Sequence, residues 1–527
     1  MRSTLHDTLR HISRRLRGQA GARSLACVVA ATAAMAVTTA HAAPAAPASR
    51  TTPAPPTLSA DGWKQAAIAD IEAAYYVTLD NHPGVHDPAN PEFAVNLDKA
   101  RDAALVLAAQ VRDNAGYAAA LQHFSALIRD GRAGVLLRDV PTPTLRWPGF
   151  STAWRGDNMF VSATTPGGPA VGARINDCDG KPIAKLVENN VFGFGQRSGG
   201  PGPAWAYARD VFVDQGNPFI TLPVQCIFID EGRESRLTLE WRVMDEAAQQ
   251  QRTSSFNGPT LPLGLSQPRA GLHWISLPTF QPDDAQRAAY GAMLAELQGN
   301  RQRYLNADAL VIDLRDNLGG DPVWGVQLAQ ALWGQARVER RIKVANARQE
   351  IWWRASFDNI AHTAFQAVRL DEQEKGALAA EARAISQGMM AAQARDDKFY
   401  VEPSRAVDIS AADRAEDLPG DPPALTRPVY VIVPGQCTGA CLEALDVFAL
   451  FANTRLVGAP SAADSSYTEV RLEPLKSGMA TVIVPNKMLV NRPRLTGTFY
   501  TPAVAVNDLE WSQRAFLKAI EHDLARR

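Results

Sequence analysis

The sequence of residues 309–320, ALVIDLRDNLGG, decides the fold. Its first half is an apolar run broken only by Asp313, which is the pattern of a strand buried on both faces. A strand pattern over 271–277 and a helix pattern over 283–301 precede it, and an amphipathic helix pattern over 323–332 follows. Strand, helix and strand in this order predict a parallel crossover. Ligands of open α/β sheets bind beyond the carboxyl ends of such strands, which directs attention to Gly319 and Gly320.

The glycine pair has chemistry of its own. Consecutive glycines permit positive φ and leave backbone N–H groups uncovered, so a carbonyl oxygen can approach two donors at the start of a helix. We therefore predict an oxyanion hole made by the backbone around Gly319, Gly320 and Asp321, with one donor from Ala440 on a facing loop. The alternative is a tight strand-to-helix turn that binds no ligand.

A second buried parallel unit follows later in the chain. Its strand patterns cover 429–433 and 454–458, with a helix pattern over 442–451 between them. The loop 434–441, PGQCTGAC, follows the first of these strands. Residues 335–426 are polar with helical stretches such as 372–394, and we predict a helical insertion or lid within a core that spans 265–515.

Two further regions precede this core. Apolar residues recur at helical spacing between Ser59 and about Leu137, which predicts a helical N-terminal domain over 58–140 that ends at the turn 130–134, DGRAG. Residues 141–246 instead show short strand patterns and the turn 179–182, DGKP. Five prolines among alanines in residues 43–57 predict an extended linker.

Composition excludes several classes of protein. At 527 residues, with 46% hydrophobic and 21% charged residues, the chain is an ordinary globular protein of roughly three to four domains. Its 54 basic and 55 acidic side chains give a net charge of -1, which argues against a nucleic-acid partner or an anionic membrane surface.

Residues 1–42 resemble an export signal. Six arginines lie ahead of an apolar, alanine-rich run over 24–39, and Ala40-His41-Ala42 has the small-x-small pattern of a cleavage site. The run is too short for a membrane span, and Arg14-Arg15 as a twin-arginine signal is a weaker alternative. We expect an exported, periplasmic or secreted protein without a membrane span, whose 48 basic and 54 acidic residues give a charge of about -6.

Four cysteines remain after removal of that signal. In an oxidising compartment an even number predicts disulfides, and we favour Cys178 with Cys226 and Cys437 with Cys441, because each pair falls within one predicted domain. Free buried thiols are the alternative.

The sequence resembles the C-terminal processing, or tail-specific, serine peptidases. Three stretches carry the resemblance, which spans about residues 60 to 510: 310–320, 429–445 with the following Leu456-Val457-Gly458, and the strand and DGKP segment ahead of both. It implies a multidomain α+β/α/β fold with a ClpP/crotonase-like core, a PDZ-like domain that accepts an added peptide strand, a helical N-terminal domain and the helical insertion. It also implies recognition and hydrolysis of peptide or unfolded-protein C-termini.

The resemblance places the catalytic groups at positions that lack them here. The family's Ser corresponds to Gly439, 19 positions ahead of Gly458. The Lys base of the processing enzymes corresponds in register to about Asp464, and the His of another branch, in an Asp-Gly-His element, corresponds to Arg132. A guanidinium with a pKa above about 12 cannot accept a proton at neutral pH. Because nucleophile and base act as one unit, we predict that hydrolysis is weakened or lost.

Other nucleophilic side chains lie close to the same positions. Thr438, next to Gly439, is a candidate nucleophile after a local register shift, although its β-branch makes it stiff. Cys441 is a second candidate unless it pairs with Cys437. Ser461, Ser465 and Ser466 fit turn residues better.

The remaining expectations concern ligands. His82 and His86 suggest surface loop histidines more than a metal site, since no ligand partner lies at metal-binding spacing, and we expect neither a metal nor a cofactor. We expect a tail-specific peptidase homologue whose partner is a peptide or unfolded protein, which Arg132 and backbone donors can bind without cleavage. The alternatives are a non-catalytic periplasmic peptide-binding scaffold and, on fold analogy alone, an esterase or acyl-CoA hydrolase.

Overall fold

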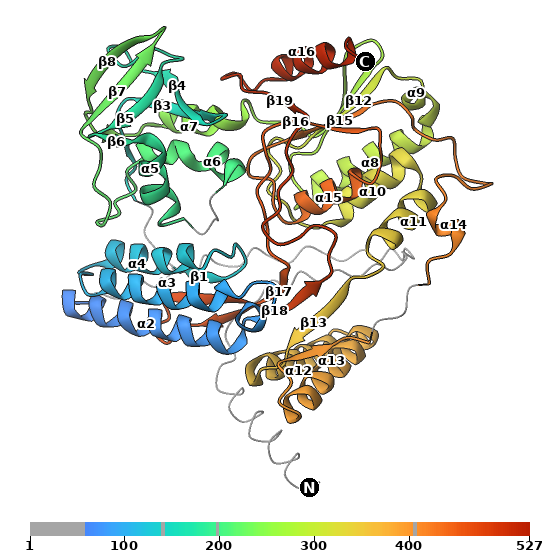
Figure 1. Ribbon diagram of the computed structural model, residues 1–527, viewed down its shortest axis with the longest axis horizontal. Coiled ribbons are helices and arrows are strands. Elements are labelled where there is room, and N and C mark those ends of the chain that lie inside the picture. The colour runs from blue at the N-terminus through green and yellow to red at the C-terminus, as the bar shows by residue number, and fades with distance from the viewer. Residues whose placement is uncertain (1–57, 139–142, 196–199, 404–407) are drawn as a thin grey trace, which may run out of the picture.

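The computed structural model describes residues 58–138, 143–195, 200–403 and 408–527. Three bodies are visible: an N-terminal helical bundle packed on a sheet, a small β-rich domain, and a larger α/β core (Figure 1). The protein is thus a mixed α/β, multidomain chain, as predicted. The expected export signal and linker, residues 1–57, lie outside the described residues. Within the described ranges, no helix has the length and hydrophobicity needed to cross a bilayer.

The core is built on a six-stranded sheet. Its order is β10-β11-β12-β15-β16-β19, and every neighbouring pair except β10 and β11 is parallel. The strands span Gly264–Arg269, Leu272–Ser276, Ala309–Asp313, Val429–Val433, Thr454–Gly458 and Val504–Ala505. All residues of β12 and β15 are buried, and the two strands pair side by side. The loops that leave their carboxyl ends therefore start next to each other.

Helices cover both faces of this sheet. Because successive strand residues face opposite sides, Leu310 and Ile312 pack on one face and Val311 on the other. The first face is covered by α8 (Asp284–Gly299), α10 (Val323–Trp333) and α15 (Ala440–Phe448), and the second by α16 (Gln513–Leu524). Both loops that follow β12 and β15 thus lead into helices on the same face.

The N-terminal helices share a core with the far end of the chain. They are α2 (Ala60–Asn81), α3 (Glu92–Ala108) and α4 (Asn114–Ile128), and α4 leads into β1 (Gly134–Leu137). β1 pairs with β18 (Ala480–Val490), which also pairs with β17 (Tyr467–Pro474). The apolar faces of the helices bury Tyr467, Val482 and Met488 from these strands. This packing holds the turn before β1 against the segment before β17.

The predicted helical insertion is only partly helical. It contains α11 (Gln335–Ala345), α12 (Phe357–Glu372), α13 (Gly376–Ala394) and α14 (Ala411–Arg414). It also contains two strands that the sequence did not reveal, β13 (Glu350–Arg354) and β14 (Phe399–Val401). β13 pairs with β18, so these strands extend the sheet under the N-terminal helices. Pairing with a distant strand fixes β13, and local sequence patterns do not report such a partner.

The β-rich domain has a five-stranded antiparallel path. Its order is β3-β4-β5-β7-β8, over Phe150–Arg155, Asn158–Thr164, Arg174–Cys178, Gln225–Asp230 and Arg233–Thr238. The short β6 (Lys181–Pro182) leads into α5 (Ile183–Leu186) and the π-helical turn η2 (Val187–Phe192). Cys178 on β5 forms a disulfide with Cys226 on β7.

The two edges of this small sheet differ. β3 is buried at all six residues, because α6 (Pro201–Tyr207), η3 (Ala208–Phe212) and α7 (Glu246–Asn257) cover it. The ring of Phe212 in η3 packs 5.0 Å from that of Phe150 in β3. The chain's own residues in α6, η3 and α7 thus cover this edge. β8 is the open edge, and it carries exposed charges such as Arg233 and Glu234, which discourage pairing with another strand.

Candidate active site

Two glycine-bearing loops meet beyond the carboxyl ends of β12 and β15. A Cβ placed on Gly319 would lie 2.9 Å from the carbonyl oxygen of Thr438 and 3.4 Å from the amide nitrogen of Ala440. Gly319 also has φ of 94°, a value that residues with a side chain rarely adopt. Only glycine permits this approach, so the structure brings the predicted glycine pair into backbone contact with the loop that carries Gly439.

Each loop presents a backbone donor to this junction. The N–H of Gly319 is already used, because it donates to Asn317 Oδ1 at 2.8 Å. Among the described residues, the N–H groups of Gly320 and Ala440 have no hydrogen-bond partner. Ala440 is the first residue of α15, where the helix dipole adds positive potential. Two such amides favour a carbonyl or carboxylate oxygen.

Gly439 forms the tip of the second loop. It is the N-cap residue of α15, with φ of 55° and ψ of -127°, a conformation that is strained for residues with a side chain. A Cβ built on Gly439 would meet nothing within 4 Å. In a nucleophile elbow, a serine occupies such a sharp turn between strand and helix. Here the elbow is present and its side chain is absent.

Thr438 does not replace the missing serine in this arrangement. Its side chain is exposed, and within the described part of the chain its hydroxyl has no hydrogen-bond partner. A hydroxyl becomes an effective nucleophile when a base within hydrogen-bond reach takes its proton. Among the described residues, no such base is hydrogen-bonded to the Thr438 hydroxyl.

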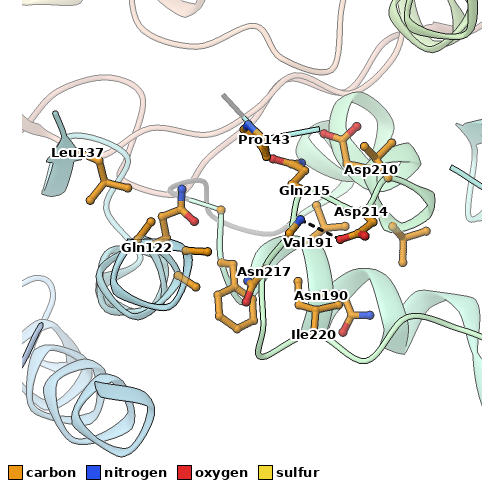
Figure 2. Close-up of a pocket in the computed structure, with 18 of the residues that line it drawn as sticks. Gln122, Leu137, Pro143, Asn190, Val191, Asp210, Asp214, Gln215, Asn217 and Ile220 are labelled. Atoms are coloured by element: carbon orange, nitrogen blue, oxygen red, sulfur yellow. Dashed lines mark hydrogen bonds between the residues drawn. The ribbon is translucent and has the colours of Figure 1, made fainter. Parts of the chain in front are cut away.

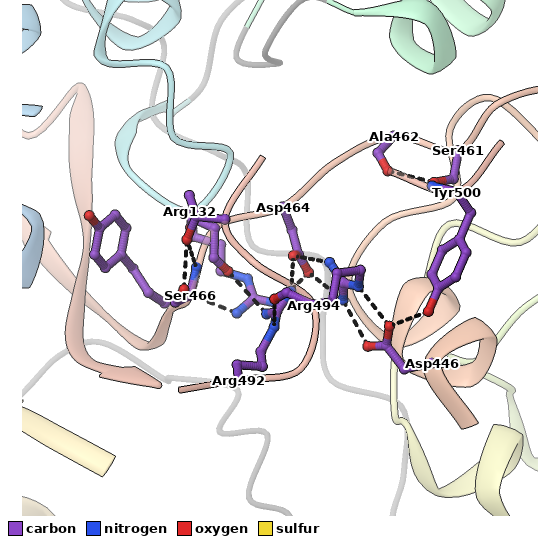
Figure 3. A network of polar contacts seen from close by, with 12 residues as sticks. Arg132, Asp446, Ser461, Ala462, Asp464, Ser466, Arg492, Arg494 and Tyr500 are labelled. Carbon is purple, nitrogen blue, oxygen red and sulfur yellow. Dashed lines mark hydrogen bonds and ion pairs between the residues drawn. The ribbon is translucent and has the colours of Figure 1, made fainter. Parts of the chain in front are cut away.

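Arg132 lies on the turn between α4 and β1 and pairs with Asp464 (Figure 3). Its Nη2 is 3.7 Å from Asp464 Oδ2, and its Nη1 donates to the carbonyl oxygen of Tyr467 at 2.9 Å. The guanidinium remains 25% exposed, whereas the Asp464 carboxylate is only 5% exposed. The side chains at the two positions that the resemblance assigns to a base therefore form an ion pair.

Two further arginines bind Asp464 (Figure 3). Arg492 Nη2 lies 2.6 Å from Asp464 Oδ1. Arg494 also pairs with Asp464, and its Nε donates to Asp446 Oδ1 at 2.8 Å. Burial opposes ionisation of Asp464, but Arg494, Arg492 and Arg132 together lower the pKa of its carboxyl. Asp446 and Asp464 in turn raise the pKa of Arg494 against the effect of burial. Asp464 and Arg494 are therefore both ionised at neutral pH.

A buried carboxylate positions the turn that carries Arg132. Asp130 Oδ1 accepts from the N–H of Arg132 at 3.0 Å and from Ser465 Oγ at 2.8 Å, and its Oδ2 lies 3.0 Å from His82 Nε2. His82 Nδ1 accepts from the N–H of Gly84, so Nε2 is the donor to Asp130. The expectation of a surface His82 is wrong, since the ring is fully buried and stacks on Phe93. The α2 terminus thus supports the candidate site.

Glu443 adds a carboxyl one helical turn after Gly439. Among the described residues, this carboxyl has no ion pair or hydrogen-bond partner. Burial raises the pKa of Glu443; Asp464 and Asp446 also raise it, while Arg132 and Arg492 lower it.

Sequence reasoning missed most of the polar network around these loops. Ser465 was assigned to a turn, and Asp446, Arg492, Arg494 and Glu443 were not singled out. Arg492 and Arg494 follow β18 and reach back to α15 and to Asp464. No spacing signal connects residues so far apart in the chain, and only the paired arginines in 492–494 hinted at a charged cluster.

A separate cavity lies away from the elbow. It has a volume of about 930 Å³ and lies between α4 and the β-rich domain (Figure 2). Gln122, Leu137, Asn190 and Asn217 are among its lining residues, whereas neither glycine-bearing loop lines it. Within the described ranges, no group of three or more histidine, cysteine, aspartate or glutamate side chains could hold a metal ion.

Comparison with known proteins identifies the fold. No family model matches the sequence, and no curated protein matches it. Among solved structures, mature CPAF matches with a TM-score of 0.55 and 13% identity over 88% of this chain and 98% of that chain. Mature CPAF complexed with lactacystin matches with a TM-score of 0.54 and 13% identity, over 88% of this chain and 99% of that chain. The photosystem II D1 C-terminal processing protease matches with a TM-score of 0.32 and 14% identity, over 85% of this chain and 98% of that chain.

The chain has the tail-specific protease fold. The resemblance stated from the sequence is therefore confirmed at the level of the fold. At 13% identity the likeness to CPAF establishes the architecture and leaves the activity to the residues of the site. In this tail-specific protease fold, the elbow, the glycine pair and the Arg132–Asp464 pair are the features from which a function has to be argued.

Proposed function

We propose that this protein is an exported tail-specific peptidase homologue that binds the C-terminal ends of peptides or unfolded proteins, with peptide-bond hydrolysis lost or severely weakened. In this interpretation the β-rich domain is PDZ-like and the core is ClpP/crotonase-like. The observation that carries the proposal is the elbow at Gly439, which keeps backbone donors on both sides and lacks the attacking hydroxyl.

The proposed ligand is a carboxylate because of the charges around the elbow. The amides of Gly320 and Ala440 offer two donors, and Arg132 is the partly exposed cation of the cluster. Asp464 already binds Arg492 and Arg494, so Arg132 is the guanidinium with hydrogen-bonding capacity to spare. A charge-assisted hydrogen bond from Arg to a carboxylate is about twice as strong as a neutral one. A chain terminus supplies such a carboxylate.

The covered edge of the PDZ-like domain changes how a peptide would bind. A peptide strand cannot add to β3, because α6, η3 and α7 cover this strand. We therefore assign recognition of the terminus to the elbow and Arg132. Gly202 in α6 approaches the elbow side of the core so closely that a Cβ would lie 2.2 Å from the carbonyl oxygen of Ser461. The PDZ-like domain thus borders the site without offering that edge.

A binding experiment tests the ligand. A fluorescent peptide with a free C-terminal carboxylate is titrated with the mature protein by anisotropy, alongside the same peptide with an amidated C-terminus. We expect the acid form to bind at least ten times more tightly, and Arg132→Gln to remove most of that preference, since hydrogen bonds to charged groups contribute about 1.5–3 kcal/mol. Equal affinity for both peptides would reject carboxylate recognition.

A labelling experiment tests the absence of catalysis. The protein is treated with a serine-reactive fluorophosphonate and, separately, incubated with a reduced and alkylated protein substrate. We expect neither covalent labelling nor cleavage, in contrast to an active serine hydrolase run in parallel. Cleavage that is abolished in Thr438→Ala would establish Thr438 as the nucleophile and reject degeneracy. Peptide binding without cleavage supports the non-catalytic scaffold as the protein's role.

A further inference from the structure

A buried disulfide between Cys437 and Cys441 constrains the elbow. Cys437 precedes the tip residues Thr438 and Gly439, Cys441 lies in the first turn of α15, and the two are joined with a Cα–Cα distance of 5.3 Å. Both side chains are completely buried, within the same cluster as Leu442. Ala440, which supplies one of the two site amides, lies inside the ring that this disulfide closes.

The start of the elbow loop is anchored by hydrogen bonds, from Gln436 Nε2 to Arg315 O at 2.6 Å and from Cys437 N to Pro434 O at 3.1 Å. Its tip has fewer contacts: Thr438 is exposed, and among the described residues no atom lies within 4 Å of a Cβ built on Gly439. The backbone of the turn is held by two hydrogen bonds, from Cys441 N to Thr438 O at 3.2 Å and from Glu443 N to Gly439 O at 3.0 Å. A glycine at the tip has more conformational freedom than any other residue, which makes such a turn easy to relax.

The opposite loop has its own anchors. Asn317 accepts from the N–H of Gly319 at 2.8 Å and donates to Leu277 O at 3.0 Å, and the N–H of Asp321 donates to Phe280 O at 2.7 Å. The donor at Gly320 is therefore fixed by side-chain and backbone hydrogen bonds. The donor at Ala440 instead depends on the conformation of a glycine turn whose covalent constraint is the disulfide.

We propose that Cys437 and Cys441 are positioning residues of the candidate site, because their disulfide holds the amide of Ala440 opposite that of Gly320. Without the bridge, Gly439 relaxes and the two donors no longer converge on one oxygen. The inference rests on the proposed function for its ligand. It goes beyond that function by making the affinity of the site dependent on one specific covalent bond.

The second disulfide provides a matched control. Cys178 and Cys226 are equally buried, but they join β5 and β7 of the PDZ-like domain. Their sequence separation is 48 residues, against 4 for the elbow disulfide. In the chain-entropy account a bridge stabilises more when it closes a longer loop. Removal of the control bridge should therefore lower stability more and affect the elbow less.

The experiment compares the double variants C437A/C441A and C178A/C226A with the wild type. Affinity for the peptide with a free C-terminal carboxylate is measured by anisotropy, stability by urea unfolding, and local opening by hydrogen exchange of peptides covering 316–325 and 434–445. We expect C437A/C441A to lose at least tenfold in affinity and to exchange faster at 434–445. We expect C178A/C226A to show the larger fall in urea midpoint with unchanged affinity and unchanged exchange at 434–445.

The readouts separate failure of this inference from failure of the proposed function. If the wild type does not bind the peptide, the proposed function is wrong, and hydrogen exchange alone then decides whether the disulfide holds the elbow. Unchanged exchange at 434–445 in C437A/C441A, or an equal change in both double variants, would overturn the positioning role. Faster exchange there in C437A/C441A alone would support it.

Discussion

Arg132 and Asp464 form an ion pair across the candidate site, with 3.7 Å between Nη2 and Oδ2. By the resemblance to tail-specific peptidases, these two positions would hold the base in one branch of the family or the other. Neither group can serve as that base here. The guanidinium keeps its proton at neutral pH, and the arginines around Asp464 lower the pKa of its carboxyl. The pair therefore has a structural role, and under the proposed function it stands where the family has a base.

We predict that Asp464→Asn strongly destabilises the protein. The substitution leaves Arg492 and Arg494 buried beside a neutral amide, and breaking a buried pair in this way costs about 3–5 kcal/mol. Urea unfolding at pH 7 measures the effect. Asp371→Asn is the control, because Asp371 and Arg383 form a pair that is about half exposed and such pairs contribute about 0–1 kcal/mol.

The same variant should alter the pH dependence of stability. Since the pKa of Asp464 is lower in the folded state, its contribution is present above the ordinary value of 3.8 and is lost as pH falls through the lower folded value. The free energy of unfolding should therefore decrease less steeply between pH 5 and pH 3 for Asp464→Asn than for the wild type. Parallel slopes would show that Asp464 is not held ionised by the arginines.

Glu443→Gln should stabilise the protein above neutral pH, whereas Asp464→Asn should destabilise it. Burial, together with Asp464 and Asp446, raises the pKa of Glu443 in the folded state. Its contribution to stability is then present at low pH and is lost as pH rises through the raised folded value. The glutamine variant should be more stable than the wild type at pH 8 and equal to it near pH 4. A variant that is less stable at pH 8 would indicate that the ionised carboxylate has a partner after all.

The sequence predicted the strands and loops of the site better than its side-chain contacts. The apolar runs at 309–314 and 429–433 fixed β12 and β15, because a strand buried on both faces needs a continuous apolar run. The glycine pair predicted uncovered backbone donors; among the described residues the N–H of Gly320 has no hydrogen-bond partner, whereas that of Gly319 donates to Asn317 Oδ1. His82 was misassigned because its partner Asp130 lies 48 positions away, across the bundle. Long-range polar pairs of this kind leave no periodic signal in the chain.

Arg155 should control the docking of the β-rich domain on the core. Its guanidinium is buried and donates to the carbonyl oxygens of Asp508, Leu509 and Ser255, with the ring of Trp205 4.7 Å away. Burial, with repulsion from Arg209, lowers the pKa of Arg155 to about 9. We predict that Arg155→Met destabilises the protein by about 2–4 kcal/mol, because each buried carbonyl left unpaired costs about 1–3 kcal/mol.

The measurement for Arg155→Met is urea unfolding at pH 7 with hydrogen exchange of residues 505–512. Faster exchange in this segment is expected, since three of its backbone carbonyls accept from arginine side chains, two from Arg155 and one from Arg315. Arg233→Met on the exposed strand β8 is the control and should change stability by less than about 0.5 kcal/mol. If Arg155→Met and Arg233→Met changed stability and exchange equally, Arg155 would not control the docking of the domain.

Gly439→Ser restores the side chain that the elbow lacks and tests what else is missing. A Cβ at this position meets nothing within 4 Å, so the hydroxyl can be accommodated. The φ of 55° should make the substitution destabilising by about 1–3 kcal/mol, and Gly439→Ala should cost a similar amount because it adopts the same backbone conformation. We expect Gly439→Ser to cleave an unfolded substrate no faster than Gly439→Ala, since Arg132 cannot accept the serine proton. Cleavage by the serine variant alone would mean that a base already lies within reach of the elbow, and that the side chain of residue 439 was the one component lost.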